Sequence, residues 1–154
     1  VRENVRIALQ RARGNSYDFW RSERVLRELD PHADELIDAV GLRGFERTSA
    51  GELPYGRKRA LEIATTLALE PEMMLLDEPT AGMAHEDVGR ITALIRRVAA
   101  NRTVLMVEHN LSVVSTLSDR ITVLARGEIL AEGDYATVSR HPAVVEAYLG
   151  ASDG

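Results

Sequence analysis

The sequence predicts an α/β protein, in which a helical part is followed by a mostly parallel sheet with helices and then by an antiparallel hairpin. Before residue 50 no strand pattern occurs, and apolar residues recur at helical spacing. Residues 73–76 and 103–107 are apolar stretches of strand length, and the first is typical of a strand covered on both faces in a parallel sheet. Residues 121–124 and 128–131 flank a short turn and indicate a hairpin.

The composition is that of an ordinary globular protein. The 154 residues suit one domain or part of a larger one, and a hydrophobic fraction of 45% is enough to build a core. A net charge of −5 argues against a general nucleic-acid binder, and the absence of cysteine excludes disulfides and thiolate metal sites in these residues. No apolar run approaches the roughly 18 residues of a membrane span, and no signal peptide is recognisable. We therefore expect a soluble, cytoplasmic protein.

The first 50 residues are expected to form helices only. An amphipathic helix over 1–13 precedes a turn at 14–16, and a second helix is expected over about 22–29. Asp30-Pro31 should end that helix, and Gly41 is placed to cap the third. The apolar positions that define the first and third helices are Val5, Ala8, Leu9, Ala12, Ala33, Leu36, Ile37 and Val40.

A loop at 53–57 opens the next helix, which should run to about Leu69. Because a helix N-terminus presents unpaired amides and a partial positive charge, it attracts anions, and Gly56 lets the backbone approach a ligand closely. The basic run 57–59 opposes the helix dipole, which is unfavourable unless an anion lies there. An ordinary loop-to-helix start with a solvated basic patch fits the same residues, so both interpretations stay open.

Two acids, Asp77 and Glu78, directly follow the apolar strand at 73–76. This position is the carboxyl edge of the sheet, where open α/β folds bind ligands, and carboxylate oxygens suit Mg²⁺. Because side chains alternate along a strand, we expect the two acids to point apart, so that one can hold Mg²⁺ while the other reaches an attacking water. The alternative is a pair of solvated acids that start a turn, since Pro79 and Gly82 follow.

A tight connection at 81–84 leads to a helix, and then to a second predicted buried strand over 103–107 that is rich in β-branched residues. His109 follows this strand. A histidine at the carboxyl end of a parallel strand can donate to a γ-phosphate oxygen, although a lone histidine is more often structural. His85 is expected to be a surface residue near a helix start. The connecting helix has its apolar face at Val88, Ile91, Leu94, Ile95 and Val98.

The chain is expected to end in helices on either side of the hairpin. A short helix with Leu111, Val114 and Leu117 should precede it. Residues 135–149 read as two short helices, with Pro142 in the first turn of the second.

Taken together, these segments resemble the ATP-binding subunit of ABC transporters, most closely the branched-chain amino-acid uptake type. The resemblance covers nearly the whole chain, with four motifs in the family's order, and the tail at 142–150 is similar to the end of that subtype. Met74–Pro79 resembles the Walker B strand with its catalytic glutamate, and His109 the switch histidine. Leu53, Pro54, Tyr55, Gly56 and Arg57 stand at the signature loop, and Ala81, Gly82, Met83 and Ala84 stand at the D-loop.

The resemblance implies a partial P-loop NTPase (ABC ATPase) fold, with ATP and Mg²⁺ as cofactors. It implies that Asp77 is the Mg²⁺ residue, that Glu78 polarises the attacking water and that His109 contacts the γ-phosphate. The signature loop and the D-loop would be cofactor-binding, because in this family two chains sandwich each nucleotide. Five positions depart from the common pattern: Pro54 replaces a serine, Tyr55 a glycine, Arg57 and Lys58 the usual glutamines, and Ala84 an acid found in many members.

A phosphate-binding loop of the type G-x-x-x-x-G-K-[ST] does not occur in these residues, because the only lysine, Lys58, is followed by Arg59. Residues 1–5 resemble the segment just after the family's glutamine loop. We therefore expect the natural gene to encode roughly a hundred further residues upstream. The expected function is that of the C-terminal part of an ATP-hydrolysing subunit that powers uptake of branched-chain amino acids or related small solutes. The alternative is a non-catalytic, self-associating fragment that cannot bind ATP by itself.

The expected partners are a second copy of the subunit or a paralogue, and membrane-spanning permease subunits, but no nucleic acid. Through the permease, the protein would lie on the inner face of the cell membrane. Residues 1–50 are expected to be the helical subdomain, which either faces the permease or merely covers the sheet. Residues 51–133 would hold the catalytic motifs, and 134–154 would form a helical tail. The transported solute is not readable from these residues.

Overall fold

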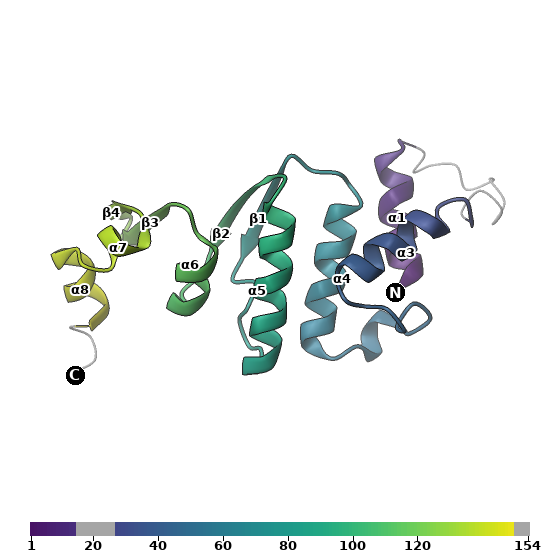
Figure 1. The fold of residues 1–154 in the computed structure, drawn as a ribbon, viewed down its shortest axis with the longest axis horizontal. Coiled ribbons are helices and arrows are strands. Elements are labelled where there is room, and N and C mark those ends of the chain that lie inside the picture. The colour runs from purple at the N-terminus through teal and green to yellow at the C-terminus, as the bar shows by residue number, and fades with distance from the viewer. Residues whose placement is uncertain (15–26, 150–154) are drawn as a thin grey trace. The chain divides into compact units, whose positions relative to one another are not determined.

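The structure, a computed structural model, describes residues 1–14 and 27–149. It divides into two compact units, Val1–Val107 and Glu108–Gly154, each described here by itself. The order of the elements along the chain can be followed in Figure 1.

The first unit begins with a group of packed helices, α1 (Arg2–Ala12), α3 (Asp30–Ala39) and α4 (Tyr55–Leu67). These helices lie against one another, and the 3-10 turn η1 (Ala50–Glu52) packs on α4 (Figure 1). The described residues before the signature loop contain no strand, as the sequence predicts. The buried side chains that hold the three helices together include Val5, Leu9, Ala33, Ile37, Leu61 and Ala64.

The predicted first and third helices are confirmed, and ion pairs join them. Arg2 bonds to Asp34 at 2.8 Å, and Arg6 bonds to Asp30. Asp30 and Pro31 form the first turn of α3, where a proline is tolerated because the first N–H groups of a helix lack intrahelical partners. The helix predicted over 22–29 lies mostly outside the described residues.

Gly41 ends α3 as predicted. Its φ of 74° is left-handed, its N–H donates to the carbonyl of Asp38 at 3.0 Å, and the next N–H, of Leu42, donates to that of Ile37 at 2.9 Å. These two bonds define a Schellman motif, and the apolar contact that often accompanies it would join Leu42 and Ile37, both almost fully buried. The glycine thereby turns the chain from α3 toward the signature loop.

A parallel pair of strands forms the second part of this unit. β1 (Met73–Asp77) pairs with β2 (Thr103–Val107) in register, from Met73 opposite Thr103 to Asp77 opposite Val107. Helix α5 (His85–Ala99) connects them and packs against α4. The predicted parallel sheet and its crossover helix are therefore confirmed.

The prediction that these strands are buried on both faces is wrong for the described structure. Met74 is 1% exposed, whereas Leu75 is 71% exposed, and on β2 Leu105 and Val107 are 56% and 61% exposed. Because side chains alternate along a strand, this pattern means that one face of the pair is covered and the other is open. The continuous apolar run indicates the environment the strand can tolerate, and the described residues cover only one face.

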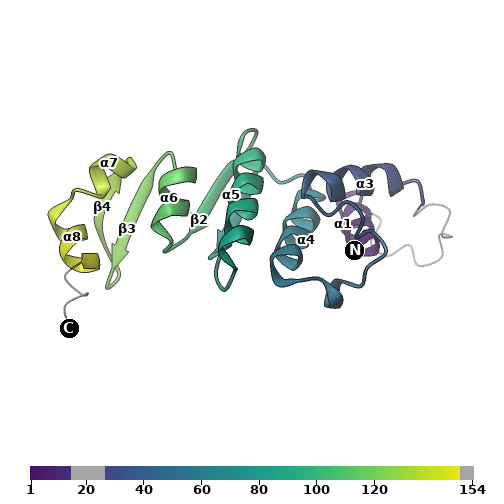
Figure 2. The same cartoon turned by 60° about the horizontal axis from the view of Figure 1, so that its bottom comes forward.

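The second unit contains α6 (Leu111–Leu117), a hairpin and two short helices. In the hairpin, β3 (Ile121–Ala125) and β4 (Glu128–Gly133) are antiparallel, and Arg126 and Gly127 between them have φ of 53° and 83°. Positive φ at both central residues is typical of a type I′ turn. The helices α7 (Tyr135–Val138) and α8 (Pro142–Leu149) pack on β4 (Figure 2). The predicted hairpin and terminal helices are thus confirmed.

In the part of the chain that the structure describes, no helix combines the length and the apolar character needed to cross a bilayer.

Candidate functional site

The two acids lie at the carboxyl end of the parallel pair. Asp77 is the last residue of β1 and pairs with Val107, the last residue of β2. The N–H of Glu78 donates to the carbonyl of Val107 at 2.8 Å, so both acids are fixed to the end of the neighbouring strand. Both are exposed to solvent. Both side chains therefore lie at the solvent-exposed edge where the sequence predicts a ligand.

Glu78 does not continue the strand, so the expectation that the two acids simply alternate along it is wrong. Its φ is 41°, in the left-handed region that is uncommon for residues other than glycine. The carbonyl of Glu78 accepts the N–H of Ala81 at 3.1 Å, and Pro79 and Thr80 between them are buried. Such a conformation costs on the order of 1–3 kcal/mol and persists only where the surroundings fix it, which is typical of functional sites.

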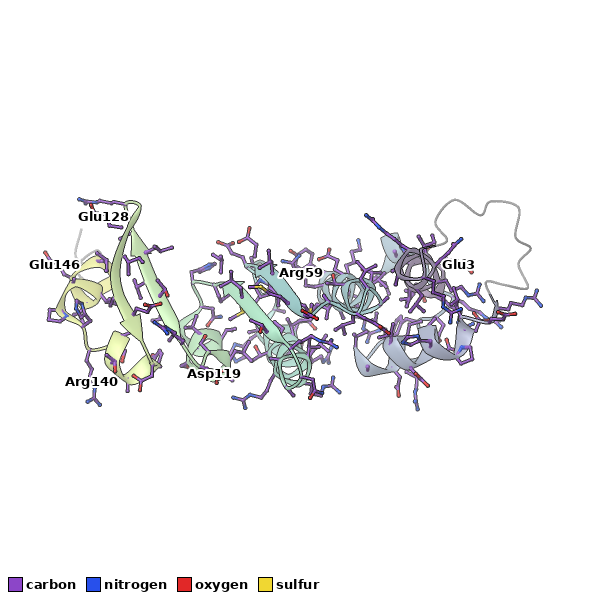
Figure 3. The ribbon with its side chains drawn as sticks, turned by 90° about the horizontal axis from the view of Figure 1, so that it is seen from above. Glu3, Arg59, Asp119, Glu128, Arg140 and Glu146 are labelled. Carbon is purple, nitrogen blue, oxygen red and sulfur yellow. The ribbon has the colours of Figure 1, made fainter. Side chains whose placement is uncertain are left out.

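Arg59 of α4 reaches the same point, a contact that the sequence did not predict. Its guanidinium donates to the carbonyl of Asp77 at 2.7 Å and to that of Glu78 at 3.4 Å (Arg59 is labelled in Figure 3). A second nitrogen bonds to Glu62 at 2.6 Å. The only sequence signal for Arg59 is its place in the basic run, which does not indicate a partner 18 residues away.

The signature loop forms the N-terminus of α4. Pro54 is the N-cap residue and makes no side-chain cap bond, while its carbonyl accepts the N–H groups of Arg57 and Lys58, both at 3.0 Å. Leu53 is buried and Tyr55 is 56% exposed. An uncapped helix N-terminus beside an exposed tyrosine can receive an anion.

Two of the three residues of the basic run, Arg57 and Arg59, contact groups of the first unit, and anion binding at this helix start stays a prediction. The guanidinium of Arg57 lies 3.8 Å from the ring centroid of Phe45, a cation–π contact. Arg59 is held by two carbonyls and Glu62. At least two of the three charges therefore have partners within the first unit.

Gly56 is buried, and the space over it is taken by Asp87 of α5. A Cβ atom at position 56 would lie 2.7 Å from Cγ and 2.8 Å from Oδ2 of Asp87. Asp87 also bonds to Arg90 at 3.3 Å. Sequence reasoning missed Asp87, because an acid in the first turn of a helix is common for dipole reasons alone. The contact with Asp87 is therefore enough to require glycine at position 56, whether or not a ligand binds there.

The connection at 81–84 lies next to the signature loop of the same chain. Gly82 has a φ of 71°, and a Cβ built on it would lie 4.0 Å from the ring of Tyr55. The N–H of Met83 donates to the carbonyl of Thr80 at 3.3 Å. Ala84 is the N-cap residue of α5, and His85 is its exposed first residue, as predicted.

His109 belongs to the second unit and follows Val107 by two residues. Its side chain is exposed. The next residue, Asn110, caps α6 by accepting the N–H groups of Ser112 at 3.1 Å and Val113 at 3.4 Å. The cap fixes the chain direction just after His109, whose γ-phosphate role stays a prediction.

The donor set at the strand ends fits Mg²⁺ held largely by a substrate rather than by the protein. Asp77 offers an exposed carboxylate, and a hollow of about 360 Å³ adjoins it between α4 and β1. Within residues 1–14 and 27–149, no three acid or histidine side chains gather as a metal cage. Mg²⁺ is commonly bound by one or two carboxylates together with phosphate oxygens and water, so a single well-placed aspartate suffices.

Two family models match parts of this sequence. The model described as "ABC transporter" matches residues 1–81, and the model described as "Branched-chain amino acid ATP-binding cassette transporter" matches residues 128–154.

Curated relatives include two proteins named as high-affinity branched-chain amino acid transport ATP-binding proteins. BraF of Pseudomonas aeruginosa is 39% identical over 134 residues, which are 86% of this chain and 51% of that protein. LivG of Escherichia coli is 36% identical over 129 residues, which are 82% of this chain and 51% of that protein. The chain therefore spans about half the length of the curated relatives it matches.

Solved structures show the same fold. The ADP conformation of MJ1267, an ATP-binding cassette of an ABC transporter, aligns with a TM-score of 0.74 and 27% identity, over 96% of this chain and 62% of that one. A nucleotide-free ATP-binding cassette aligns with a TM-score of 0.71 and 26% identity, over 94% of this chain and 61% of that one. The architecture is that of an ATP-binding cassette.

Proposed function

The chain belongs to the ABC transporter family, and from that premise we propose that it is part of a subunit that hydrolyses ATP to drive transport. The observation that supports this most is the position of Asp77 and Glu78, exposed at the carboxyl end of a parallel strand pair. The left-handed backbone of Glu78 also supports the proposal, because such strain is typical of a functional site.

In the proposed reaction, water attacks the γ-phosphorus of ATP, the bond to the bridging oxygen breaks, and ADP and phosphate leave. Asp77 would hold Mg²⁺, and the metal would supply positive charge that neutralises the phosphates. Glu78 orients the attacking water and takes its proton. His109 donates to a γ-phosphate oxygen, and the start of α4 binds the terminal phosphate of a nucleotide held mainly by a second copy or a paralogous subunit.

For the transported solute we propose branched-chain amino acids or related small solutes. The supports are the printed names of BraF and LivG and the match of residues 128–154 to the branched-chain family model. The proposed partners are membrane-spanning permease subunits, and they would hold the protein on the inner face of the membrane.

The metal-dependent step can be tested with Asp77→Asn in the protein expressed from its own gene, with whatever residues precede Val1. Asparagine keeps the shape but removes the charge that favours Mg²⁺. We expect turnover of Mg-ATP to fall by about 100-fold or more and to stop for both proteins when EDTA removes the metal. Wild-type turnover in Asp77→Asn would contradict the metal role, and an inactive wild type would contradict the proposed function.

A second candidate is that the 154-residue chain alone does not catalyse but self-associates. The open face of the strand pair favours it, since Leu75, Leu105 and Val107 are each more than half exposed. Sedimentation of the isolated chain, compared with its Leu75→Lys variant, tests this. A wild-type dimer that dissociates in the variant supports it, whereas a monomer that hydrolyses Mg-ATP at an ordinary rate contradicts it.

A further inference from the structure

Arg59 joins the signature helix to the two acids through backbone oxygens. Its guanidinium donates to the carbonyls of Asp77 and Glu78, at 2.7 Å and 3.4 Å, from a position one turn into α4. The planar fork of arginine carries five N–H donors, so that one side chain can hold several acceptors in a fixed arrangement. The start of α4 is therefore tied directly to the end of β1.

The backbone of Glu78 is in the left-handed region, a conformation that persists only where surrounding groups fix it. The N–H of Glu78 donates to the carbonyl of Val107 at 2.8 Å, and the carbonyl of Glu78 accepts the N–H of Ala81 at 3.1 Å. The charged donor makes its short bond, at 2.7 Å, to the carbonyl of Asp77, which belongs to the same peptide unit as the Glu78 N–H, and a long one, at 3.4 Å, to the carbonyl of Glu78. Because φ and ψ of a residue set the direction of its own side chain, these bonds also orient the carboxylate.

We propose that Arg59 is a positioning residue, which fixes the backbone of Glu78 and so couples the signature helix to the acid that orients water. The inference rests on the proposed function of Glu78 in ATP hydrolysis.

The ion pair between Arg59 and Glu62 provides a matched control. The two residues are three positions apart on the exposed surface of α4, where such pairs contribute little to stability. Glu62→Gln removes this pair but leaves both carbonyl bonds. If turnover depends only on the charge of α4, Glu62→Gln should change it. If turnover depends on the bonds of Arg59 to the two carbonyls, Glu62→Gln should leave it unchanged.

The experiment uses Arg59→Gln, Arg59→Lys and Glu62→Gln in the protein expressed from its own gene. We expect Arg59→Gln to lower kcat for Mg-ATP by about 10- to 100-fold, because small displacements of a catalytic group have effects of this size, while KM changes less than about twofold. Arg59→Lys should recover part of the loss, since an ammonium can still donate to one carbonyl. Glu62→Gln should match wild type.

Hydrogen exchange supplies a readout that does not depend on turnover. The amide of Ala81 is bonded to the carbonyl that Arg59 holds, so it should exchange several-fold faster in Arg59→Gln than in wild type or Glu62→Gln. If Arg59→Gln does not fold, Arg59→Lys is compared with wild type, and the amide of Ala81 should then exchange faster by a smaller factor. Unchanged exchange at Ala81 would overturn the positioning role, whatever the turnover.

The kinetic outcomes separate this inference from the proposed function. An active wild type, an inactive Glu78→Gln and a fully active Arg59→Gln would overturn the inference alone. A raised KM with unchanged kcat in Arg59→Gln would assign Arg59 to nucleotide binding and also overturn it. A wild type without turnover would overturn the proposed function, and exchange at Ala81 would still decide whether Arg59 holds the backbone.

Discussion

Two glutamates of the first unit, Glu70 and Glu78, have left-handed backbones, with φ of 50° and 41°. Glu70 lies in the turn after α4, where its N–H donates to the carbonyl of Leu67 at 2.9 Å. Glu78 lies at the end of β1 among the groups proposed to act on ATP. The same backbone strain thus occurs once in an ordinary turn and once at the candidate site.

Glycine at position 70 and at position 78 should distinguish the effect of backbone strain on stability from the effect of the side chain on ATP turnover. Glu70→Gly and Glu78→Gly should each stabilise the fold by about 1 kcal/mol, because relief of left-handed strain exceeds the entropy that glycine loses on folding. Only Glu78→Gly should abolish ATP turnover. Urea unfolding and turnover measured on both variants check this. A Glu78→Gly variant that is destabilised would show that its side chain contributes to the fold.

Substitution at Gly56 tests the contact with Asp87. Gly56→Ala should destabilise the fold by about 1–3 kcal/mol, because its Cβ would overlap Cγ and Oδ2 of Asp87. In an Asp87→Ala background the cost should fall, because the two nearest atoms, Cγ and Oδ2, are removed while the Cβ at 3.0 Å remains.

The control for this cycle is Gly89→Ala, since no atom lies within 4 Å of a Cβ at that position inside α5. We expect Gly89→Ala to stabilise by up to about 1 kcal/mol. Equal costs of Gly56→Ala in the two backgrounds would mean that Asp87 does not fill the space over Gly56. Urea unfolding measures all four variants.

At the scale of elements, local patterns predicted the helices and strands well, and contacts between distant elements poorly. The parallel pair, the hairpin and the Gly41 cap follow from periodicity and turn chemistry that act over a few residues. The contacts of Arg59 with Asp77 and of Asp87 with Gly56 span more than 15 positions each. No local pattern encodes them, because they depend on how α4, α5 and β1 pack.

The candidate site was predicted in part. The position of Asp77 and Glu78 at a strand end follows from an apolar run that stops at two acids. The left-handed backbone of Glu78 does not, because a glutamate gives no sign of a positive φ, which is uncommon for residues other than glycine. The open face of β1 was also missed, since an apolar residue such as Leu75 indicates a tolerance for burial and not the presence of a cover.

The N-cap of α7 should make the stability of the fold depend on pH. Hydrogen bonds from the hydroxyl and the backbone N–H of Thr137 lower the pKa of Asp134, the N-cap residue. A lowered pKa means that the cap contributes stability above the ordinary aspartate pKa of about 3.9, and that this contribution is lost as pH falls through the lowered value. Asp134→Asn keeps an acceptor but cannot titrate, so its stability should change less between pH 5 and pH 2.

Thermal unfolding followed by circular dichroism at a series of pH values checks the Asp134 prediction. The melting temperature of wild type should exceed that of Asp134→Ala at pH 7, and the two should converge at low pH. Parallel curves for wild type and Asp134→Asn over the whole range would show that the carboxylate of Asp134 does not contribute.

At the scale of the whole molecule, the described chain has the architecture of part of an ATP-binding cassette and carries the residues that we propose act on ATP. The first unit holds the signature helix, the acids and the 81–84 connection, and the second holds His109. The chain spans about half the length of BraF and LivG, so ATP hydrolysis is proposed for the subunit of which these residues are part.

Turnover of Mg-ATP by Glu78→Gln, measured beside wild type in the protein expressed from its own gene, shows whether Glu78 takes a proton from the attacking water. Glutamine keeps the size of the side chain but cannot take a proton. The account predicts that this variant binds ATP with unchanged affinity and hydrolyses it at least about 100-fold more slowly than wild type. Hydrolysis at the wild-type rate in Glu78→Gln would contradict it.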